Sequence, residues 1–370
     1  MQPQATSAVG AGWAGAGSGG DGGGQADPAP GGSGGGGQTP PEQFSAADFF
    51  AGANDPNATP ESVLAGFPPD TAQKIADVRS RLEGEEQTIN RYKKNGAWTP
   101  ERSKLHEQII SRFITPELLE AAKPPKGQKP TFTILGGRGG SGKSWFKGQV
   151  YDPAKCVCLD ADEIKGMLSE YEGWNAAVVH EESGELFDHI TDLAQQLGLN
   201  IVHDATMKTP KKAVALVQHF KDSGYRVEAH YMHLPRQEAA RRAVERFLKG
   251  GSTGRFVPPE VVLGNTQNEQ GFDQVKGLAD AWSFRDNGAA KGSGPTLISE
   301  KADETHSRQS GLSGRPGAQA QPGDGGAPAP GASPGGKAKA QDEFHKGTSP
   351  EGYAKAGTGR IVVPRSHPRK

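Results

Sequence analysis

The sequence is short of cysteine and of hydrophobic residues. Two of its 370 residues are cysteine and 33% are hydrophobic, whereas 53 are glycine and 28 are proline. No apolar run approaches the roughly 18 to 20 residues of a membrane span, and the first residues lack the basic and apolar regions of a secretory signal. We therefore expect a cytoplasmic protein without a membrane segment, in which the folded part is smaller than the chain.

The chain also lacks an excess of either charge. Lys and Arg number 42 and Asp and Glu number 43, so the formal net charge is −1 and gives no reason to expect nucleic acid as a partner. Residues 1–41 and 301–370 consist largely of Gly, Ala, Pro and Ser. Such segments bury too little apolar surface to offset the entropy lost on ordering, so both are predicted to be disordered tails.

The two cysteines, Cys156 and Cys158, lie two positions apart in a predicted strand. This spacing places both side chains on one face of the strand. They cannot easily bridge each other, and a metal site would need more ligands. We expect two buried structural thiols.

Between the tails, residues 42–125 are predicted to form a helical prefix. Residues 67–96 carry apolar positions at helical spacing, and a further helix is expected to begin at Thr99 as N-cap with Pro100 at its first position. The segment "KPPKGQKP" then ends the helical pattern. The apolar face expected for the further helix comprises Leu105, Ile109, Ile110 and Phe113.

Residues 126–300 alternate short apolar runs with amphipathic helices, which is typical of βαβ units. The fold class predicted is α/β, with a mostly parallel sheet flanked by helices. Strands are expected at 131–135, 156–160, 200–204, 227–234 and 282–286. Helices are expected at 183–197, with Ser183 as a candidate cap, at 209–224 and at 236–249.

The stretch "TILGGRGGSGKSWF" contains a phosphate-binding motif. Gly137, Gly142, Lys143 and Ser144 satisfy GxxxxGK[ST] directly after a predicted strand and before a predicted helix. Main-chain amides and the helix N-terminus favour phosphate, Lys143 reaches the β and γ phosphates, and the Ser144 hydroxyl binds Mg²⁺. We therefore expect ATP and Mg²⁺ to bind. The residues expected to contact the nucleotide are Gly137, Gly139, Gly140, Ser141, Gly142, Lys143, Ser144 and Trp145.

Polar residues follow two of the predicted strands. Asp160 and Asp162 end one strand, and Asp204, Thr206 and Lys208 follow another. In an open parallel sheet, ligands collect beyond the carboxyl ends of the strands. An Asp there can accept a hydroxyl proton or hold Mg²⁺, and it can also merely cap a helix. We favour a functional role for Asp162 and Asp204 and leave Asp160 open.

Positive charge is expected over the transferring phosphoryl group. Arg242 and Arg246 lie one turn apart on a predicted helix, and Arg255 lies in the glycine-rich segment that follows and that is expected to close like a lid. We favour catalysis for Arg246 and Arg255. The segment "VVHEESGELFDH", which contains His180 and Asp188, does not have the spacing of a zinc motif, so a pocket wall and a solvated helix start both stay open.

Together these stretches resemble the zeta toxin family of P-loop kinases. The resemblance runs from "TFTILGGRGGSGKS" through "CLDADEIK", "NIVHDATMKTPKKA", "GYRVEAHYMHLP" and "AVERF" to "GRFVPPEV", and the order and spacing of the pieces carry it. It implies ATP-dependent phosphorylation of a sugar hydroxyl on UDP-N-acetylglucosamine. It also implies an antitoxin protein as partner.

The resemblance implies a role for each candidate residue. Asp162 matches the catalytic base, and Arg246 and Arg255 match two arginines that stabilise the transferring phosphoryl group. Lys143 and Ser144 match the phosphate and magnesium groups of the catalytic site. The residues matched to the acceptor side are Asp188, Asp204, Thr206 and Lys208. Three of these depart from the family pattern, which has Glu, Glu and Arg at positions 188, 204 and 208.

Several alternatives remain to be weighed. A GTPase is disfavoured because no N-K-x-D guanine signature occurs in the sequence, and a motor ATPase would need a longer module. A P-loop kinase for another nucleotide or small-molecule hydroxyl stays open, as does a nucleotide-gated interaction module without turnover. For the helical prefix, packing on the kinase as extra core is preferred over restraint of the kinase in cis.

Overall fold

The computed structural model describes four ranges, residues 41–49, 51–250, 254–288 and 294–302. The tails predicted to be disordered therefore lie almost entirely outside the described residues, as do residues 251–253 of the glycine-rich segment. Within these ranges, none of the helices combines the length and apolar composition that a bilayer span requires.

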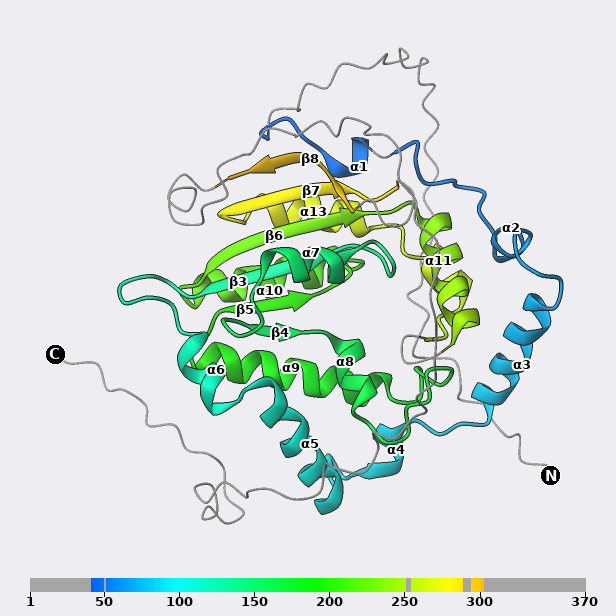
Figure 1. The fold of residues 1–370 in the computed structure, drawn as a ribbon, viewed down its shortest axis with the longest axis horizontal. Helices are drawn as coiled ribbons and strands as arrows, with labels where there is room; N and C mark the ends of the chain where they lie inside the picture. The colour runs from blue at the N-terminus through cyan, green and yellow to red at the C-terminus, as the bar shows by residue number, and fades with distance from the viewer. Residues whose placement is uncertain (1–40, 50, 251–253, 289–293, 303–370) are drawn as a thin grey trace, which may run out of the picture. The chain divides into compact units, whose positions relative to one another are not determined.

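A six-stranded sheet forms the centre of the fold (Figure 1). Its first five strands run parallel, and the last pairs antiparallel with its neighbour. In spatial order the strands are β4 (Val157–Leu159), β5 (Ile201–Asp204), β3 (Thr131–Gly136), β6 (Arg226–His233), β7 (Ala281–Asp286) and β8 (Thr296–Lys301). The predicted mostly parallel sheet is confirmed, while β8 had no counterpart among the predicted strands.

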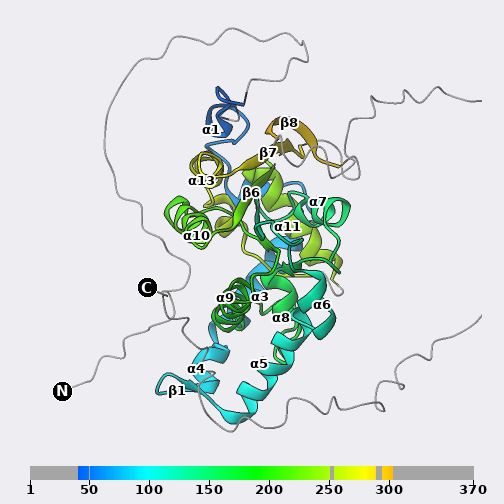
Figure 2. The same cartoon turned by 90° about the vertical axis from the view of Figure 1, so that its left-hand side faces the viewer.

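Helices cover both faces of this sheet. Helix α7 (Lys143–Val150) lies on one face, and α10 (Pro210–Asp222) and α13 (Asn268–Lys276) lie on the other (Figure 2). Near the carboxyl ends of the strands lie α8 (Ala161–Gly166) and α11 (Arg236–Lys249) (Figure 1), and α12 (Pro259–Leu263) packs against α11. Helix α9 (His180–Gln196) packs against β4 and β5. This arrangement is the P-loop kinase architecture expected from the sequence.

The core explains why the strands read as continuous apolar runs. Phe132, Ile134 and Leu135 of β3 are fully buried, because helices cover the sheet on both sides. The Phe132 ring stacks on Phe220 of α10 with 3.7 Å between ring centroids. Strand β3 is thus fixed at the centre of the sheet, directly before the phosphate loop.

The prefix folds into six helices and a small hairpin among the described residues. The helices are α1 (Ala46–Phe49), α2 (Pro60–Leu64), α3 (Thr71–Glu83), α4 (Thr88–Tyr92), α5 (Pro100–Phe113) and α6 (Pro116–Ala121). Strands β1 (Lys93–Lys94) and β2 (Ala97–Trp98) form the hairpin. Thr99 caps α5 by accepting a hydrogen bond from the Arg102 amide, as predicted.

One expectation for the prefix is wrong, since residues 67–96 do not form one helical stretch. Helix α3 ends at Glu83 with Gly84 as its C-cap, and α4 is followed by the hairpin, whose turn places Asn95 at φ 53° and Gly96 at φ 81°. Both residues of such a tight turn need positive φ, which an Asn-Gly pair supplies easily. The Asn-Gly pair was overlooked because the apolar positions of residues 67–96 were interpreted as helical spacing.

The prefix and the sheet share one hydrophobic core. Phe44, Ile109 and Phe113 belong to the same buried cluster as the β3 residues Phe132 and Ile134. Figure 1 shows α2 and α3 on the outer side of α11, and a second buried cluster joins these three helices. The prefix is therefore packed into the fold.

Helix α9 also begins earlier than predicted. It starts at His180, so Ser183 lies inside the first turn, is buried, and donates its hydroxyl hydrogen to the His180 carbonyl at 2.8 Å. A serine so placed bonds back into its own helix, so the expectation that Ser183 caps the helix is wrong. Helices α12 and α13 were not predicted at all.

Candidate active site

The phosphate loop bends through three glycines with positive φ. Gly137, Gly140 and Gly142 have φ values of 132°, 80° and 94°. A Cβ on Gly137 would lie 2.3 Å from the Met232 carbonyl oxygen, so only glycine fits there. The loop thus has the tight curvature that the motif requires, and α7 begins at its last glycine.

Lys143 lies folded against this loop. Its Nζ donates to the carbonyls of Gly137 at 2.7 Å and Arg138 at 3.1 Å, and lies 3.6 Å from Oδ1 of Asp204. Ser144 and Trp145 begin α7 with exposed side chains, and Trp145 retains 49% of its exposure. The amine is therefore held at the mouth of the loop beside the end of β5.

Two arginines lie over the loop. Nη2 atoms of Arg246 and Arg255 lie 3.9 and 4.0 Å from the place where a Cβ on Gly139 would be. Within the described part of the chain, the Nε atoms of both are buried without a hydrogen-bond partner, and Arg246 has no ion-pair partner there either. Burial lowers the pKa of both guanidinium groups, and the negative charge of Asp160 opposes that effect. Guanidinium groups that are largely withdrawn from solvent and lie over a glycine loop are suited to bind an anionic group.

Asp162 is brought to the same place. Its Oδ2 pairs with Arg255 and its Oδ1 accepts a hydrogen bond from Lys165 at 3.1 Å. Asp160 caps α8, because its Oδ1 accepts from the Asp162 amide at 2.9 Å. The cap interpretation therefore holds for Asp160, although its charge also acts on both arginines.

Lys165 is a site residue that the sequence did not single out. Its side chain is only 8% exposed and burial lowers its pKa, yet it reaches the proposed base Asp162. The spacing of three positions on α8 was a usable signal, since residues i and i+3 share a helix face.

Asp204, at the end of β5, is nearly buried. Its side chain is 13% exposed, and burial raises its pKa to about 6, while Lys143 opposes the rise and Asp160 adds to it. A carboxyl group with a raised pKa beside the loop lysine is typical of a functional site. Asp160, Asp204 and Lys143 thus form one electrostatic group at the ends of β4, β5 and β3.

The other acceptor-side candidates are more dispersed. Thr206 is half-buried and its carbonyl accepts from Asn268 at 2.7 Å, while Lys208 is exposed. Asp188 is exposed on α9, where burial and Asp192 raise its pKa and Lys212 lowers it. Asp192 lies on α9 like Asp188, and Lys212 lies on the neighbouring α10.

A buried ion pair anchors the loop from behind. Arg138 is fully buried, pairs with Glu269 of α13, and donates to the carbonyls of Asn265 and Leu234. The Glu269 hydrogen bonds overcome the effect of burial and raise the pKa of Arg138, while His233 and Arg138 hold the pKa of Glu269 at about 2 against burial. Position 138 is a variable position of the motif, so this anchor could not be predicted from the motif.

Two further contacts clamp the loop at its rim. Arg242 donates to the Gly140 carbonyl at 3.0 Å and to the Asn287 carbonyl at 3.2 Å. Asn287, which follows β7, in turn donates to the Ser141 carbonyl at 2.9 Å. Arg242 therefore acts on the loop backbone, and Arg246, one turn later, points at its opening.

The residues fit a nucleotide with magnesium. The guanidinium groups of Arg246 and Arg255 face the glycine loop, and the Ser144 hydroxyl is an oxygen ligand of the kind that Mg²⁺ prefers. Among the described residues, no group of three or more His, Cys, Asp or Glu side chains is arranged to hold a metal ion by itself. Magnesium would therefore be held jointly with phosphate oxygens.

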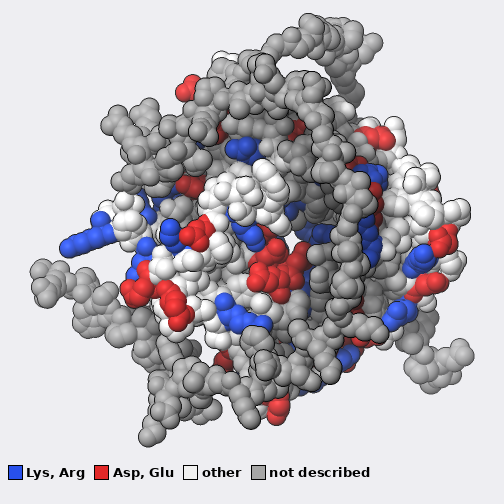
Figure 3. Space-filling view, viewed as in Figure 1, with Lys and Arg blue, Asp and Glu red and all other residues white. Residues whose placement is uncertain are grey.

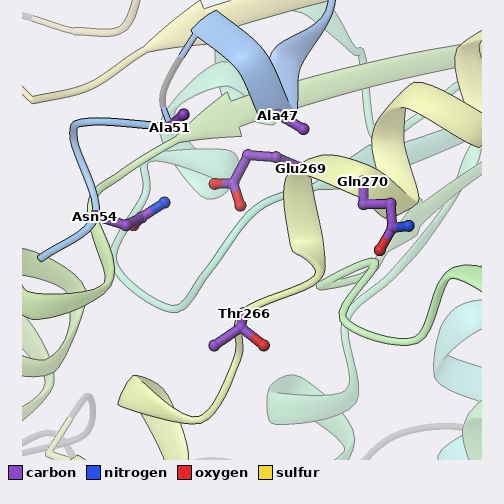
Figure 4. A pocket seen from close by; sticks show the side chains of 6 residues that line it. All are labelled: Ala47, Ala51, Asn54, Thr266, Glu269 and Gln270. Carbon is purple, nitrogen blue, oxygen red and sulfur yellow. The ribbon is translucent and has the colours of Figure 1, made fainter. Parts of the chain in front are cut away.

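The surface agrees with this placement. Figure 3 shows a group of acidic side chains near the middle of the face, close to α8, with Lys and Arg side chains around it. A cavity of about 350 Å³ lies elsewhere, between the prefix and α13 (Figure 4). It is lined by Ala47, Ala51, Asn54, Thr266, Glu269 and Gln270, none of which is a candidate for catalysis. We place the chemistry at the loop because Arg246 and Arg255 face it.

The two cysteines are free, with Cys156 buried and Cys158 half-buried. Their Sγ atoms are 3.5 Å apart, well beyond a disulfide bond. Both lie on the same face of the β4 segment, as the spacing predicted.

One segment of the chain matches a known protein family. Residues 116–281 match the family model described as zeta toxin. Among solved structures, the chain is similar to the AvrRxo1-ORF1:AvrRxo1-ORF2 complex with sulphate ions, at 19% identity over 58% of this chain and 77% of that chain, with a TM-score of 0.48. The same complex with ATP matches at 18% identity over 58% and 76%, with a TM-score of 0.48.

A further similarity is to the PezAT chromosomal toxin–antitoxin system of Streptococcus pneumoniae, at 14% identity over 52% of this chain and 79% of that chain, with a TM-score of 0.38. No curated protein matches the chain. The structural similarities are too weak to add to the family match. The family match therefore covers residues 116–281, and this segment of the chain is similar to the zeta toxin family.

Proposed function

We propose that this protein is an ATP-dependent phosphotransferase that moves the γ-phosphoryl group of ATP to a hydroxyl group of a small molecule. One observation carries the proposal. Arg246 and Arg255 converge on Gly139 of the phosphate loop, and Arg255 simultaneously pairs with Asp162. Phosphate-binding cations and a carboxylate base thus meet at one point, which is the arrangement that phosphoryl transfer needs.

The proposed reaction is an in-line displacement. Asp162 orients the acceptor hydroxyl and takes its proton while the acceptor oxygen bonds to the γ-phosphorus and the bond from that phosphorus to ADP breaks. Bound Mg²⁺ would offset charge on the β and γ phosphates. Lys143 would leave the loop carbonyls for those phosphates, and Arg255 can bridge the phosphoryl group and Asp162 because a guanidinium carries five donors.

For the acceptor we propose a sugar nucleotide such as UDP-N-acetylglucosamine, with Asp188, Asp204, Thr206 and Lys208 on the acceptor side. The match of residues 116–281 to the zeta toxin family model supports this choice. An antitoxin protein is the proposed partner, because the resemblance of residues 116–281 to the zeta toxin family implies one.

The test is to incubate the protein with ATP, Mg²⁺ and UDP-N-acetylglucosamine and to follow ADP and the phosphorylated sugar nucleotide by mass spectrometry. We expect both products in equal amounts, and Asp162→Asn should lower their rate by roughly 10²–10⁴-fold without loss of nucleotide binding. ADP without a phosphorylated sugar nucleotide would exclude this acceptor. A full rate in Asp162→Asn would exclude the assigned base.

A further inference from the structure

Residues 170–175 link the prefix to residues 254–256, which contain Arg255 and which we call the arginine loop. None of residues 170–175 was a candidate site residue in the sequence analysis. The 170–175 segment follows α8 and precedes α9, and the described residues around Arg255 pack against it. The Gly173 carbonyl accepts a hydrogen bond from the Phe256 amide at 3.1 Å. Gly173 has φ 81°, and a Cβ there would lie 2.2 Å from the Gly254 carbonyl oxygen. The residues on either side of Arg255 are therefore held directly by this segment.

The 170–175 segment is itself held together by side-chain hydrogen bonds. Asn175 donates to the Glu170 carbonyl at 2.7 Å, and its own side-chain oxygen accepts from the Glu172 amide at 2.8 Å. Asn175 is buried. A displacement of Glu170 would therefore be passed on to Gly173 between them.

Arg102 of the prefix binds Glu170. Its guanidinium donates to both carboxylate oxygens of Glu170, at 2.9 and 2.8 Å, and to both of Glu182 at the start of α9, at 2.5 and 2.8 Å. The Arg102 side chain is 5% exposed, and its face lies over the Tyr92 ring at 4.4 Å. A bidentate contact to each of two carboxylates fixes the guanidinium plane and both acids.

A second part of the prefix reaches the same region from the other side. Arg81 of α3 lies over the Trp174 ring at 3.8 Å. Phe256, directly after Arg255, is buried in one cluster with Val63 and Ile75 of the prefix. Prefix residues from α2, α3 and α5 thus contact the arginine loop or the segment that supports it.

We propose that the prefix is a brace for catalysis, in which Arg102, acting through Glu170 and Gly173, sets the position of Arg255 relative to Asp162. The proposal rests on the phosphotransferase function proposed above. Arg102 touches neither nucleotide nor acceptor in this account, so it is a positioning residue. The matched family segment begins at residue 116, so Arg102 lies outside that match, whereas Glu170 and Gly173 lie within it.

Glu170→Ala is the variant that tests the brace. It leaves the Arg102–Glu182 pair intact, whereas Arg102→Met would leave Glu182, which is fully buried, without its cation and would endanger the fold. Glu185→Ala is the matched control, because Glu185 of α9 accepts an ion pair from Lys93 of the prefix at 2.6 Å but is exposed and does not contact the 170–175 segment. Both variants are made in the full chain.

Glu170→Ala should keep a cooperative thermal transition and bind ADP within about twofold of wild type, because the phosphate loop is untouched. Its kcat should fall between about 10-fold and 100-fold, since small displacements of catalytic groups carry costs of this order. Hydrogen exchange at the Phe256 amide should become at least about 10-fold faster. Glu185→Ala should match wild type in kcat and in exchange.

Equal kcat and equal Phe256 exchange in the two variants would overturn the brace, as would an equal loss of kcat in both. The exchange measurement needs no turnover, so it separates the two proposals. Absence of phosphoryl transfer in the wild type would refute the proposed function, and faster Phe256 exchange in Glu170→Ala alone would still support the link from the prefix to the arginine loop.

Discussion

Arg246→Met should stabilise the protein and destroy its activity. Arg246 is a half-buried cation whose Nε has no hydrogen-bond partner among the described residues, and it lies over the phosphate loop. A buried polar group without a partner costs roughly 1–3 kcal/mol, and methionine keeps most of the apolar stem. Because the group is only half-buried, we take the lower end, a gain of about 1 kcal/mol.

A gain of about 1 kcal/mol corresponds to a rise in melting temperature of about 2–4 °C for a domain of this size. The same substitution should lower kcat by roughly 10²–10³-fold, because one charge-stabilising donor is lost from the transition state. Differential scanning calorimetry without nucleotide and initial-rate measurements with ATP check the two effects.

Arg241→Met is the control for this prediction. Arg241 lies on the same helix but is exposed and pairs with Glu238 and Glu245, so its loss should neither raise the melting temperature nor lower kcat. A fall in the melting temperature of Arg246→Met with unchanged kcat would refute the reasoning, because Arg246 would then be a structural residue.

Three further predictions follow from the loop and its supports. Lys143→Ala should abolish turnover, measured as ADP release, because the cation at the β and γ phosphates is lost. Wild type should lose stability as the pH rises from about 4 to 6, and Asp204→Asn should not show this loss. The folded carboxyl, with its pKa near 6, holds a proton there that the unfolded chain has released, a difference of about 3 kcal/mol measurable by urea unfolding. Glu269→Gln should weaken ADP binding, measured by calorimetry, because Arg138 loses its ion-pair partner. Wild type should lose stability as the pH falls from about 4.5 towards 2, because the Glu269 carboxylate with its depressed pKa takes up a proton there, and Glu269→Gln should reduce this loss. Unchanged ADP affinity in Glu269→Gln would contradict the predicted role of Arg138. A wild-type dependence of stability on pH in either Asp204→Asn or Glu269→Gln would contradict the prediction for that carboxyl group.

The parts of the fold that were predictable depend on local sequence. Strand β3 is an apolar run followed at once by the glycines of the phosphate-loop motif, so the strand and the loop could both be predicted from a short stretch of sequence. The cap at Thr99 is equally local, since a Thr-Pro pair satisfies the first turn of α5. Asp162 could be found because it follows a strand and the sheet is parallel.

The parts that escaped prediction depend on residues far apart in the chain. The Arg138–Glu269 pair joins residues 131 positions apart, and Arg102 reaches Glu182 over 80 positions. Neither position shows its partner by spacing or periodicity. Ser183 was misread because a serine before an apolar face looks the same whether it caps the helix or, as here, bonds back to His180.

The most direct test of the phosphoryl-transfer claim is mass spectrometry of a small-metabolite pool incubated with the protein, ATP and Mg²⁺. The account predicts one acceptor, or a narrow class of them, that gains a single phosphoryl group with wild type and not with Asp162→Asn. ATP binding without any phosphorylated metabolite would contradict the account and would favour a nucleotide-gated interaction module.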